Sequence, residues 1–268
     1  MATDAAAAAK GSPERSLGGR CIVVTRPAEQ AESLCRAIQR AGGEPLRFPV
    51  LAIGPATDSA PLNEIADQLD TFDLAFFVSP NAVRYALDSM LARRPWPSGL
   101  RVATVGKGSE RELMRFGFKQ VIAPQSGFDS ESVLALPEFA AQAVRGRRVL
   151  ILRGDGGRDL LGDTLTERGA HVVFVTCYRR YRPDLDPSPM LDRARAGALG
   201  AVLLTSSEGV DNLVIMVGAA GITALREVPV FAPHPRIAER ARAAGFQAVV
   251  ETAAGEDGMV QALLSHFG

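Results

Sequence analysis

An internal repeat at a fixed offset constrains the fold of this 268-residue chain more than any other feature of its sequence. The segment IVVTRPAEQAESLCRAIQRAGGEPLRF, which starts at Ile22, resembles VLILRGDGGRDLLGDTLTERGAHVVFV, which starts at Val149, so the offset is 149 − 22 = 127. The same offset relates the segment FDLAFFVSPNAV to LGAVLLTSSEGV. The segment RFGF, which ends at Phe118, aligns with AAGF, which ends at Phe246, at an offset of 128. Self-similarity at one offset marks repeated structure, so we expect two copies of one unit. Chance similarity between generic α/β segments is the alternative.

Short apolar runs alternate with amphipathic stretches from Cys21 onward. The runs are CIVV, LAFFV, RVATV, VLIL, VVFVT, AVLLT and VPVFA. In the first stretch between them, Ala31, Leu34 and Ile38 share one helical face that ends before Gly42 and Gly43. Continuous apolar strands that alternate with helices are typical of parallel sheets covered on both faces, so the sequence predicts an α/β fold.

The composition is that of a well-cored globular protein with balanced charge. Apolar residues make up 47% of the chain, and 30 basic residues offset 30 acidic ones. A neutral chain has no long-range field to collect nucleic acid, so we expect no nucleic-acid partner. The few cysteines and histidines have no metal-ligand or C-x-x-C spacing, which predicts no metal and a reducing, cytoplasmic location. They are Cys21, Cys35, Cys177, His171, His234 and His266.

The segment before Cys21 predicts a disordered tail. It begins with small residues and then turns polar and rich in glycine and proline, without the apolar stretch of a signal peptide. No later run reaches the roughly 18 to 20 apolar residues that span a bilayer, so we expect a soluble protein with no membrane partner.

Turns that follow the predicted strands are candidate anion sites, because ligands of parallel sheets bind where helix N-termini present free N–H groups. Ser79 and Asn81 follow LAFFV, and Ser206 and Ser207 follow AVLLT. The segment Gly106–Ser109 follows RVATV and is predicted to be a flexible turn that could approach an anion. Each serine taken alone is more often a structural helix cap than a ligand.

Arginines that stand after the first strand of each copy are further candidates for binding a carboxylate or phosphate. Arg26 and Arg153 occupy equivalent positions under the offset of the repeat. A surface arginine paired with a nearby acid is the alternative for each. The glycines after Arg153 lack the third glycine of the dinucleotide-binding G-x-G-x-x-G motif, and Walker and nucleophile-elbow motifs are absent from the sequence, so we expect no nucleotide cofactor.

The ordered set of these segments resembles the uroporphyrinogen-III synthase family from Cys21 to the C-terminus. The matching segments, in chain order, are VVTRP, FPVLAI, FVSPNAV, the VG-x-x-[ST] turn ending at Ser109, LRGDGGRDLL, the GA-x-V-x-x-V-x-x-Y ending at Tyr178, and LTSSEG. Each segment is unspecific by itself, whereas their order and spacing together are specific.

This resemblance implies two flavodoxin-like parallel-sheet α/β lobes joined by a two-stranded β-ladder. The chain starts in one lobe, builds the whole second lobe, and then returns to the first. The expected bounds are 1–17 for the tail, 18–48 with 184–268 for the first lobe, 57–171 for the second lobe, and 49–56 with 172–183 for the ladder.

The resemblance also implies a cofactor-free cyclisation of linear hydroxymethylbilane to uroporphyrinogen III, with loss of water and inversion of ring D. It places Tyr178 as the donor to the departing hydroxyl. The last family motif reads APHPRI here, without its usual threonine, and Arg236 takes that place in the prediction. The full set of expected substrate-binding residues is Arg26, Ser79, Asn81, Ser109, Arg153, Ser206, Ser207 and Arg236.

A non-catalytic two-lobed sensor of a small polyanion is the alternative function, since a fold alone does not define an activity. For Tyr178, the alternative is a strand-end tyrosine that only packs against its neighbours. For the enzyme we expect a monomer that binds hydroxymethylbilane, with a transient hand-over from the preceding pathway enzyme and no metal or cofactor.

Overall fold

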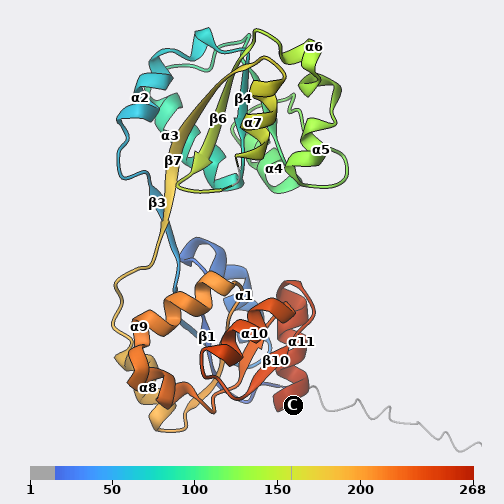
Figure 1. Cartoon of the computed structure of the whole chain (residues 1–268). Coiled ribbons are helices and arrows are strands. Elements are labelled where there is room, and N and C mark those ends of the chain that lie inside the picture. Colours follow the sequence, from blue (N-terminus) through green and yellow to red (C-terminus); the bar gives the residue numbers. More distant parts are fainter. Residues whose placement is uncertain (1–15, 158) are drawn as a thin grey trace, which may run out of the picture. The chain divides into compact units, whose positions relative to one another are not determined.

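The computed structural model describes residues 16–157 and 159–268, and its contacts divide the described chain into two units (Figure 1). Unit 1 combines the residues up to Ala52 with Arg182–Gly268, and unit 2 is the continuous segment Ile53–Tyr181. Each unit contains a five-stranded sheet with helices packed on both faces. The predicted α/β class with parallel sheets is therefore confirmed.

The sheet of unit 1 has the strand order β2-β1-β8-β9-β10, and its neighbouring strands pair in parallel. Its central strands are almost wholly buried and aliphatic, as expected where helices cover both faces of a sheet. The strands are β1 (Cys21–Val24), β2 (Glu44–Arg47), β8 (Leu199–Leu203), β9 (Val230–Ala232) and β10 (Val249–Glu251).

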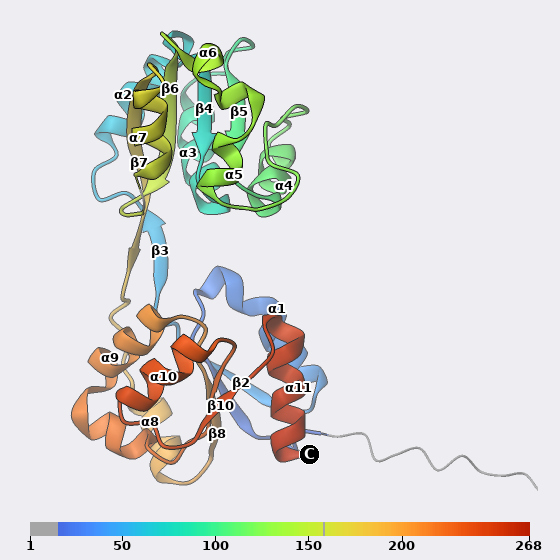
Figure 2. The same cartoon turned by 45° about the vertical axis from the view of Figure 1, so that its right-hand side comes forward.

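Two helix layers cover this sheet. The helices α1 and α11 pack together on one face around Ile22, Leu34 and Leu263, as Figure 2 shows. The helices α8, α9 and α10 cover the opposite face around Val23 and Leu213. Their bounds are α1 (Ala28–Arg40), α8 (Ser188–Arg195), α9 (Ser207–Leu225), α10 (Pro235–Ala243) and α11 (Gly255–Phe267).

Within the described ranges, α9 is the one helix that is long and apolar enough to cross a membrane, by length and composition only. It is not an unbroken apolar run of membrane-spanning length, because Asp211 and Asn212 lie within it. It is interrupted at Gly218, which has a φ of 64°. Val210, Leu213 and Leu225 are fully buried in the core of unit 1, so core packing accounts for much of its apolar composition.

The sheet of unit 2 has the strand order β3-β7-β6-β4-β5, in which β4, β5, β6 and β7 pair in parallel. The short strand β3 runs beside β7 (Figure 1). The strands are β3 (Ala52–Pro55), β4 (Leu74–Phe77), β5 (Arg101–Thr104), β6 (Arg148–Gly154) and β7 (His171–Tyr181).

The helices of unit 2 also form two layers. One layer, α2, α3 and α4, packs on the sheet face that presents Phe77 and Leu150. The other layer, α5, α6 and α7, packs on the face that presents Phe76 and Ile151. Their bounds are α2 (Ala60–Asp67), α3 (Pro80–Arg93), α4 (Lys107–Arg115), α5 (Ser130–Leu134), α6 (Ala141–Val144) and α7 (Leu160–Glu167), with 3-10 turns at Leu69–Thr71 and Pro137–Phe139.

Equivalent strand pairs of the two sheets have the same register when residue numbers are shifted by the offset of the sequence repeat. Val24 pairs with Arg47 in unit 1, and Ile151 pairs with Phe174 in unit 2, where both residue numbers are larger by the offset of the repeat. The pairing of β8 with β1 corresponds in the same way to that of β4 with β6. Each unit therefore contains strands from both copies of the repeat, and a cut at the repeat boundary would divide both units.

The structure shifts two of the predicted segment boundaries. Leu17, predicted as the end of the tail, is fully buried, and its N–H donates to the Ala41 carbonyl (2.8 Å), so it belongs to unit 1. The predicted ladder segment 172–183 lies mostly in β7, which pairs with β6 as far as Tyr178 because its apolar residues complete the sheet of unit 2. Residues 1–15 lie outside the described part of the chain, and the remaining bounds stay predictions.

Candidate active site

The carboxyl edge of the unit 2 sheet carries two helix N-termini, which follow β4 and β5. Ser79 is the N-cap of α3: its Oγ accepts a hydrogen bond from the Ala82 N–H (3.1 Å), and Pro80 takes the first helical position. Gly106 is the N-cap of α4 and has no side chain to occupy the free N–H groups. Both helices therefore direct N–H groups and positive dipole ends to this edge.

Ser109 and Asn81 lie in the first turns of these two helices. Because α4 begins at Lys107, the prediction of a flexible turn at Gly106–Ser109 is wrong, and Ser109 is a buried helix residue with 2% exposure. A glycine N-cap allowed the helix to start earlier than the sequence pattern suggested. Asn81 Oδ1 accepts a long hydrogen bond from Arg84 Nη2 (3.4 Å).

Tyr178 lies on β7 beside the N-terminus of α3. Its hydroxyl oxygen accepts a hydrogen bond from Ser79 Oγ (3.1 Å), and its ring stacks on Tyr85 with 6.1 Å between the centroids. The β6–β7 register shifts after Arg153, and both Cys177 and Tyr178 are buried in the same core cluster. With only 3% of Tyr178 exposed, packing fixes the ring and so holds the hydroxyl at the serine-capped helix end.

Gly154 makes room for this tyrosine. A Cβ atom at Gly154 would lie 2.7 Å from Tyr178 Cζ and 2.8 Å from its Cε2, closer than real Cβ atoms approach other atoms. A side chain at this position would therefore push the buried ring away from Ser79. The sequence shows Gly154 only as one of several glycines in RGDGG, so its role as a positioning residue could not be predicted from the pattern.

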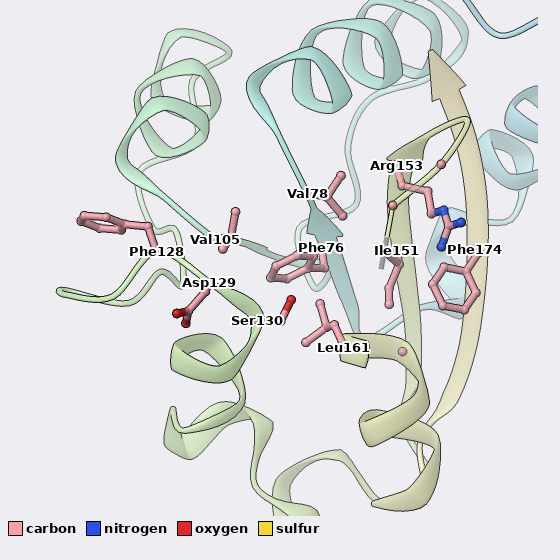
Figure 3. Close-up of a pocket in the computed structure, with 13 residues that line it drawn as sticks. Phe76, Val78, Val105, Phe128, Asp129, Ser130, Ile151, Arg153, Leu161 and Phe174 are labelled. Carbon is pink, nitrogen blue, oxygen red and sulfur yellow. The ribbon is translucent and has the colours of Figure 1, made fainter. Parts of the chain in front are cut away.

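Arg153 stands one residue earlier on β6 and lines a cavity of about 250 Å³ on the other face of the sheet, which we call the Arg153 cavity (Figure 3). Its guanidinium lies over the Phe174 ring, 5.0 Å from the centroid, and pairs with the carboxylate of Asp159. The apolar side chains around the cavity are Phe76, Val78, Val105, Phe128, Ile151, Leu161 and Phe174.

The expected site residues of unit 1 include a second serine-capped helix. Ser206 is the N-cap of α9, and its Oγ accepts a hydrogen bond from the Gly209 N–H (2.9 Å). The adjacent Ser207 has a buried Oγ without a hydrogen-bond partner among the described residues. This helix end matches the Ser79 end of α3 in chain order, capping and strand context.

The two arginines expected in unit 1 have intramolecular contacts of their own. Arg26 Nη1 binds Glu256 Oε1 at 2.7 Å, which agrees with the alternative of a paired surface arginine. Arg236 lies in the first turn of α10, and its backbone N–H donates to Nδ1 of His234 (3.1 Å). His234 is thus the N-cap residue at the place where the family motif usually has threonine, a role that sequence reasoning missed.

The edge of the unit 2 sheet brings only some of the expected residues into contact. Ser79 and Tyr178 are hydrogen-bonded, and Arg153 lines the cavity on the opposite face of the same sheet. Arg26, Ser206 and the neighbouring unit 1 residues belong to a separate sheet edge. Whether any of these side chains binds substrate remains a prediction.

The thiols of the chain are buried and poorly reactive. Burial raises the pKa of Cys177 to about 12, and burial also raises the pKa values of Cys21 and Cys35. Protonated thiols are poor nucleophiles and poor metal ligands. Across residues 16–157 and 159–268, no three His, Cys, Asp or Glu side chains are grouped closely enough to hold a metal ion. The expectation of cofactor-free chemistry itself stays a prediction.

These features define the class as an α/β protein of two related units whose sheet edges present capped helix N-termini, arginines and one fixed tyrosine. The model of the family described as uroporphyrinogen-III synthase HemD matches residues 32–261. The chain belongs to the uroporphyrinogen-III synthase family.

Curated relatives carry the same description. The chain is 35% identical to the uroporphyrinogen-III synthase of Escherichia coli over 196 residues, which covers 72% of this chain and 78% of the relative. It is 31% identical to the synthase of Synechococcus elongatus over 202 residues, which covers 74% of this chain and 75% of the relative.

Solved structures agree on the fold. The uroporphyrinogen-III synthetase of Helicobacter pylori matches with a TM-score of 0.55 at 13% identity, covering 92% of this chain and 99% of that one. A mutant uroporphyrinogen III synthase of Thermus thermophilus matches with a TM-score of 0.54 at 19% identity and the same coverage. At such identities the likeness shows the fold alone.

Proposed function

We propose that this chain is the enzyme that cyclises hydroxymethylbilane to uroporphyrinogen III in haem biosynthesis. The observation that carries the proposal is the family match over residues 32–261. The 35% identity to the Escherichia coli synthase agrees with it. The alternative function, a non-catalytic sensor of a small polyanion, is not favoured, because the matched relatives are synthases.

The proposed reaction proceeds without a redox change. The terminal hydroxyl leaves as water after protonation, and loss of the pyrrole N–H proton gives an electrophilic azafulvene. The substituted carbon of the far pyrrole attacks the exocyclic methylene and forms a spiro intermediate. The bond between the spiro carbon and the methylene of the preceding ring breaks, that methylene bonds to the unsubstituted α-carbon on the other side of the ring D nitrogen, and this carbon loses its proton, so ring D is inverted. The net change is the loss of one water molecule.

Tyr178 is the proposed proton donor to the departing hydroxyl. Ser79 Oγ donates to the tyrosine oxygen, while its own oxygen accepts from the Ala82 N–H, so the tyrosine O–H hydrogen is left to point elsewhere. General acid assistance of this kind contributes about 10² to 10⁴-fold at most. The pyrrole nitrogen already activates the leaving group, so the contribution here falls at or below the lower end of that range.

Positioning is the larger proposed contribution of the protein. Holding reacting groups in line can lower a barrier by about 7 to 11 kcal/mol. The substrate carries eight carboxylates, and a helix N-terminus stabilises a nearby anion by about 0.3 to 1 kcal/mol. The serine-capped ends of α3 and α9, together with Arg153, are proposed carboxylate ligands.

The finer description of the fold is also part of this proposal. Unit 1 follows the order 2-1-3-4-5 when its strands are numbered along the unit, which is the order of flavodoxin-like folds. The strands β4, β5, β6 and β7 of unit 2 follow the order 2-1-3-4 in the same way. We assign the pair β3 and β7 to the β-ladder that the family resemblance implies. A monomeric, cytoplasmic enzyme that needs no cofactor completes the proposal.

An isomer-resolved assay tests the function. Freshly prepared hydroxymethylbilane is incubated with the full chain in the absence of added metal and nucleotide, and the type I and type III products are separated. The proposal expects type III uroporphyrinogen to dominate. If only the type I isomer, the product of spontaneous closure, is formed, the chain is not the synthase.

A further inference from the structure

The Arg153 cavity and Tyr178 adjoin each other across one strand end. Successive residues of a strand point to opposite faces of the sheet. Arg153 lines the cavity on the face covered by α5 and α7, and the next residue, Gly154, faces the Tyr178 ring on the other side. The cavity and the tyrosine therefore adjoin the same strand end from opposite faces of the sheet.

The size of the Arg153 cavity limits what it can hold. A dry cavity of about 150 Å³ accommodates benzene, and pockets for drug-sized ligands enclose about 300 to 1,000 Å³. At about 250 Å³ this cavity has room for one five-membered ring with a short side chain, and it is too small for a tetrapyrrole.

The lining gives the cavity an apolar floor and an aromatic rim. Phe76, Ile151 and Leu161 are at most 6% exposed, whereas Phe128 is 56% exposed and Phe174 is 42% exposed. These two rings lie at opposite ends of the cavity in Figure 3. Exposed aromatic rings at the mouth of a cavity offer faces and edges on which a flat aromatic ligand can pack.

Among the residues that the structure describes, the cavity lining has one cation, Arg153, and one carboxylate, Asp129. The cation can exchange its ion-pair partner. The Arg153 side chain is 21% exposed and its partner Asp159 is 57% exposed, so the ion pair is open to solvent and weakly held. A ligand carboxylate could form the bidentate pair that a guanidinium favours. Stacking on Phe174 keeps the guanidinium plane at the cavity while its partner changes.

We propose that the Arg153 cavity binds one pyrrole ring of the substrate through its apolar walls, and one carboxylate arm of that ring through Arg153. This inference rests on the proposed function and makes the cavity the anchor that holds one ring beside the strand end where Tyr178 acts. The ligand class is a pyrrole that carries carboxylate side chains.

Methyl NMR on the full chain tests the site with a defined probe, a single pyrrole that bears one acetate and one propionate side chain. We expect saturable shifts of the methyl signals of Val105, Ile151 and Leu161. Glutarate, which has the carboxylates without the ring, and unsubstituted pyrrole, which has the ring without the carboxylates, should bind at least tenfold more weakly.

Two variants give the proposal a matched control. Arg153→Met should weaken probe binding at least tenfold, with probe-free methyl shifts that change only for residues near position 153. Arg93→Met removes another arginine of unit 2, one paired with Asp67 on the surface, and should keep the affinity within twofold. Arg153→Lys retains the charge and should lose less affinity than Arg153→Met.

Two results would overturn the inference. One is the absence of shifts at the three cavity methyls at the highest soluble probe concentration. The other is equal affinity for the wild type and Arg153→Met. If the wild type still makes type III uroporphyrinogen in either case, the cavity assignment fails while the proposed function stands, so the two failures are distinguishable.

Discussion

The two units place equivalent arginines in different surroundings. In unit 1, Arg26 is bound by Glu256 of α11, which also accepts a hydrogen bond from Ser33 Oγ (2.8 Å). In unit 2, Arg153 lies over Phe174 at the edge of an open cavity. Both arginines are in ion pairs and their side chains are about equally exposed, but Arg153 lines a cavity and its acidic partner is more exposed than that of Arg26, 57% against 31%.

Substitutions at equivalent positions account for much of this difference. Under the offset of the repeat, Phe174 takes the place of Arg47, and Asp159 takes that of Glu32. In unit 1, Glu32 binds Arg47, whereas in unit 2 no arginine stands at position 174 and the acid binds Arg153 instead. With phenylalanine at this position, Asp159 is left to pair with Arg153, and the ring supplies an aromatic wall.

Two glycines make room for aromatic rings in unit 2. Gly162 stands where unit 1 has Cys35, and a Cβ at Gly162 would overlap the Phe174 ring, so only glycine lets that ring lie across α7. Gly154 stands where unit 1 has Pro27, and it accommodates Tyr178. The comparison assigns the proposed proton donor and the ring-binding cavity to unit 2.

The largest expected effect tests whether the reactive group lies in unit 2. Tyr178→Phe keeps the ring and removes the donor, so kcat should fall by about 10²-fold or less, with KM nearly unchanged. Steady-state kinetics with hydroxymethylbilane measures both constants. Tyr181→Phe, on the same strand but 38% exposed, is the control and should keep wild-type rates. Normal kcat and normal stability in Tyr178→Phe would reject the catalytic role.

The next effect tests the space that Gly154 provides. Gly154→Ala should lower the free energy of unfolding by about 1 to 3 kcal/mol, because the buried Tyr178 ring cannot move without strain. It should also lower kcat, because the tyrosine hydroxyl is displaced from Ser79. Denaturant unfolding and kinetics measure the two effects. Gly99→Ala, where a Cβ meets nothing within 4 Å, is the control; a harmless Gly154→Ala would show that the ring is not held as described.

A third prediction compares the two arginines directly. Arg153→Ala should raise KM about tenfold, equivalent to about 1.4 kcal/mol of lost binding, with a smaller change in kcat. Arg26→Ala should raise KM less, because Glu256 already occupies its guanidinium. Equal effects of the two substitutions on KM would remove the distinction between the units.

A smaller effect is expected when Phe174 of unit 2 is replaced by arginine, the residue that unit 1 has at the equivalent position, 47. Phe174→Arg should remove one aromatic wall and the ring that holds the Arg153 guanidinium at the cavity, so KM should rise by about threefold to tenfold. The ring is 42% exposed, so the melting temperature should change little. An unchanged KM would mean that the aromatic wall contributes nothing to binding.

The smallest effect at neutral pH concerns the buried thiol of unit 2. The folded-state pKa of Cys177 is raised by burial from 9.0 to about 12, so its stabilisation is full below pH 9 and is lost as the pH rises through 12. Between these limits the loss is about 1.4 kcal/mol for each pH unit. The free energies of unfolding of the wild type and Cys177→Ala, measured from pH 8 to 11, should approach each other as the pH rises. A constant difference between them would contradict the raised pKa of Cys177.

Local patterns predicted the scaffold better than they predicted the site. The buried face of α1, which includes Leu34 and Ile38, and the serine caps at Ser79 and Ser206 follow from short-range spacing, and the structure has them. The cavity depends on Phe174 lying across Gly162, residues of separate elements whose meeting no local pattern encodes. The ion pair between Arg26 and Glu256 could not be predicted either, because the two residues belong to separate elements.

The strand order of unit 1 has a consequence for how the chain folds during synthesis. The strand β1 pairs with β8, and the Thr25 hydroxyl donates to the carbonyl of Leu203, 178 residues later (2.6 Å). Unit 2 is continuous, so it can leave the ribosome complete while β1 still lacks its partner β8. The nascent segment of β1, α1 and β2 therefore has an unpaired strand edge until β8 is synthesised, and such an edge favours aggregation.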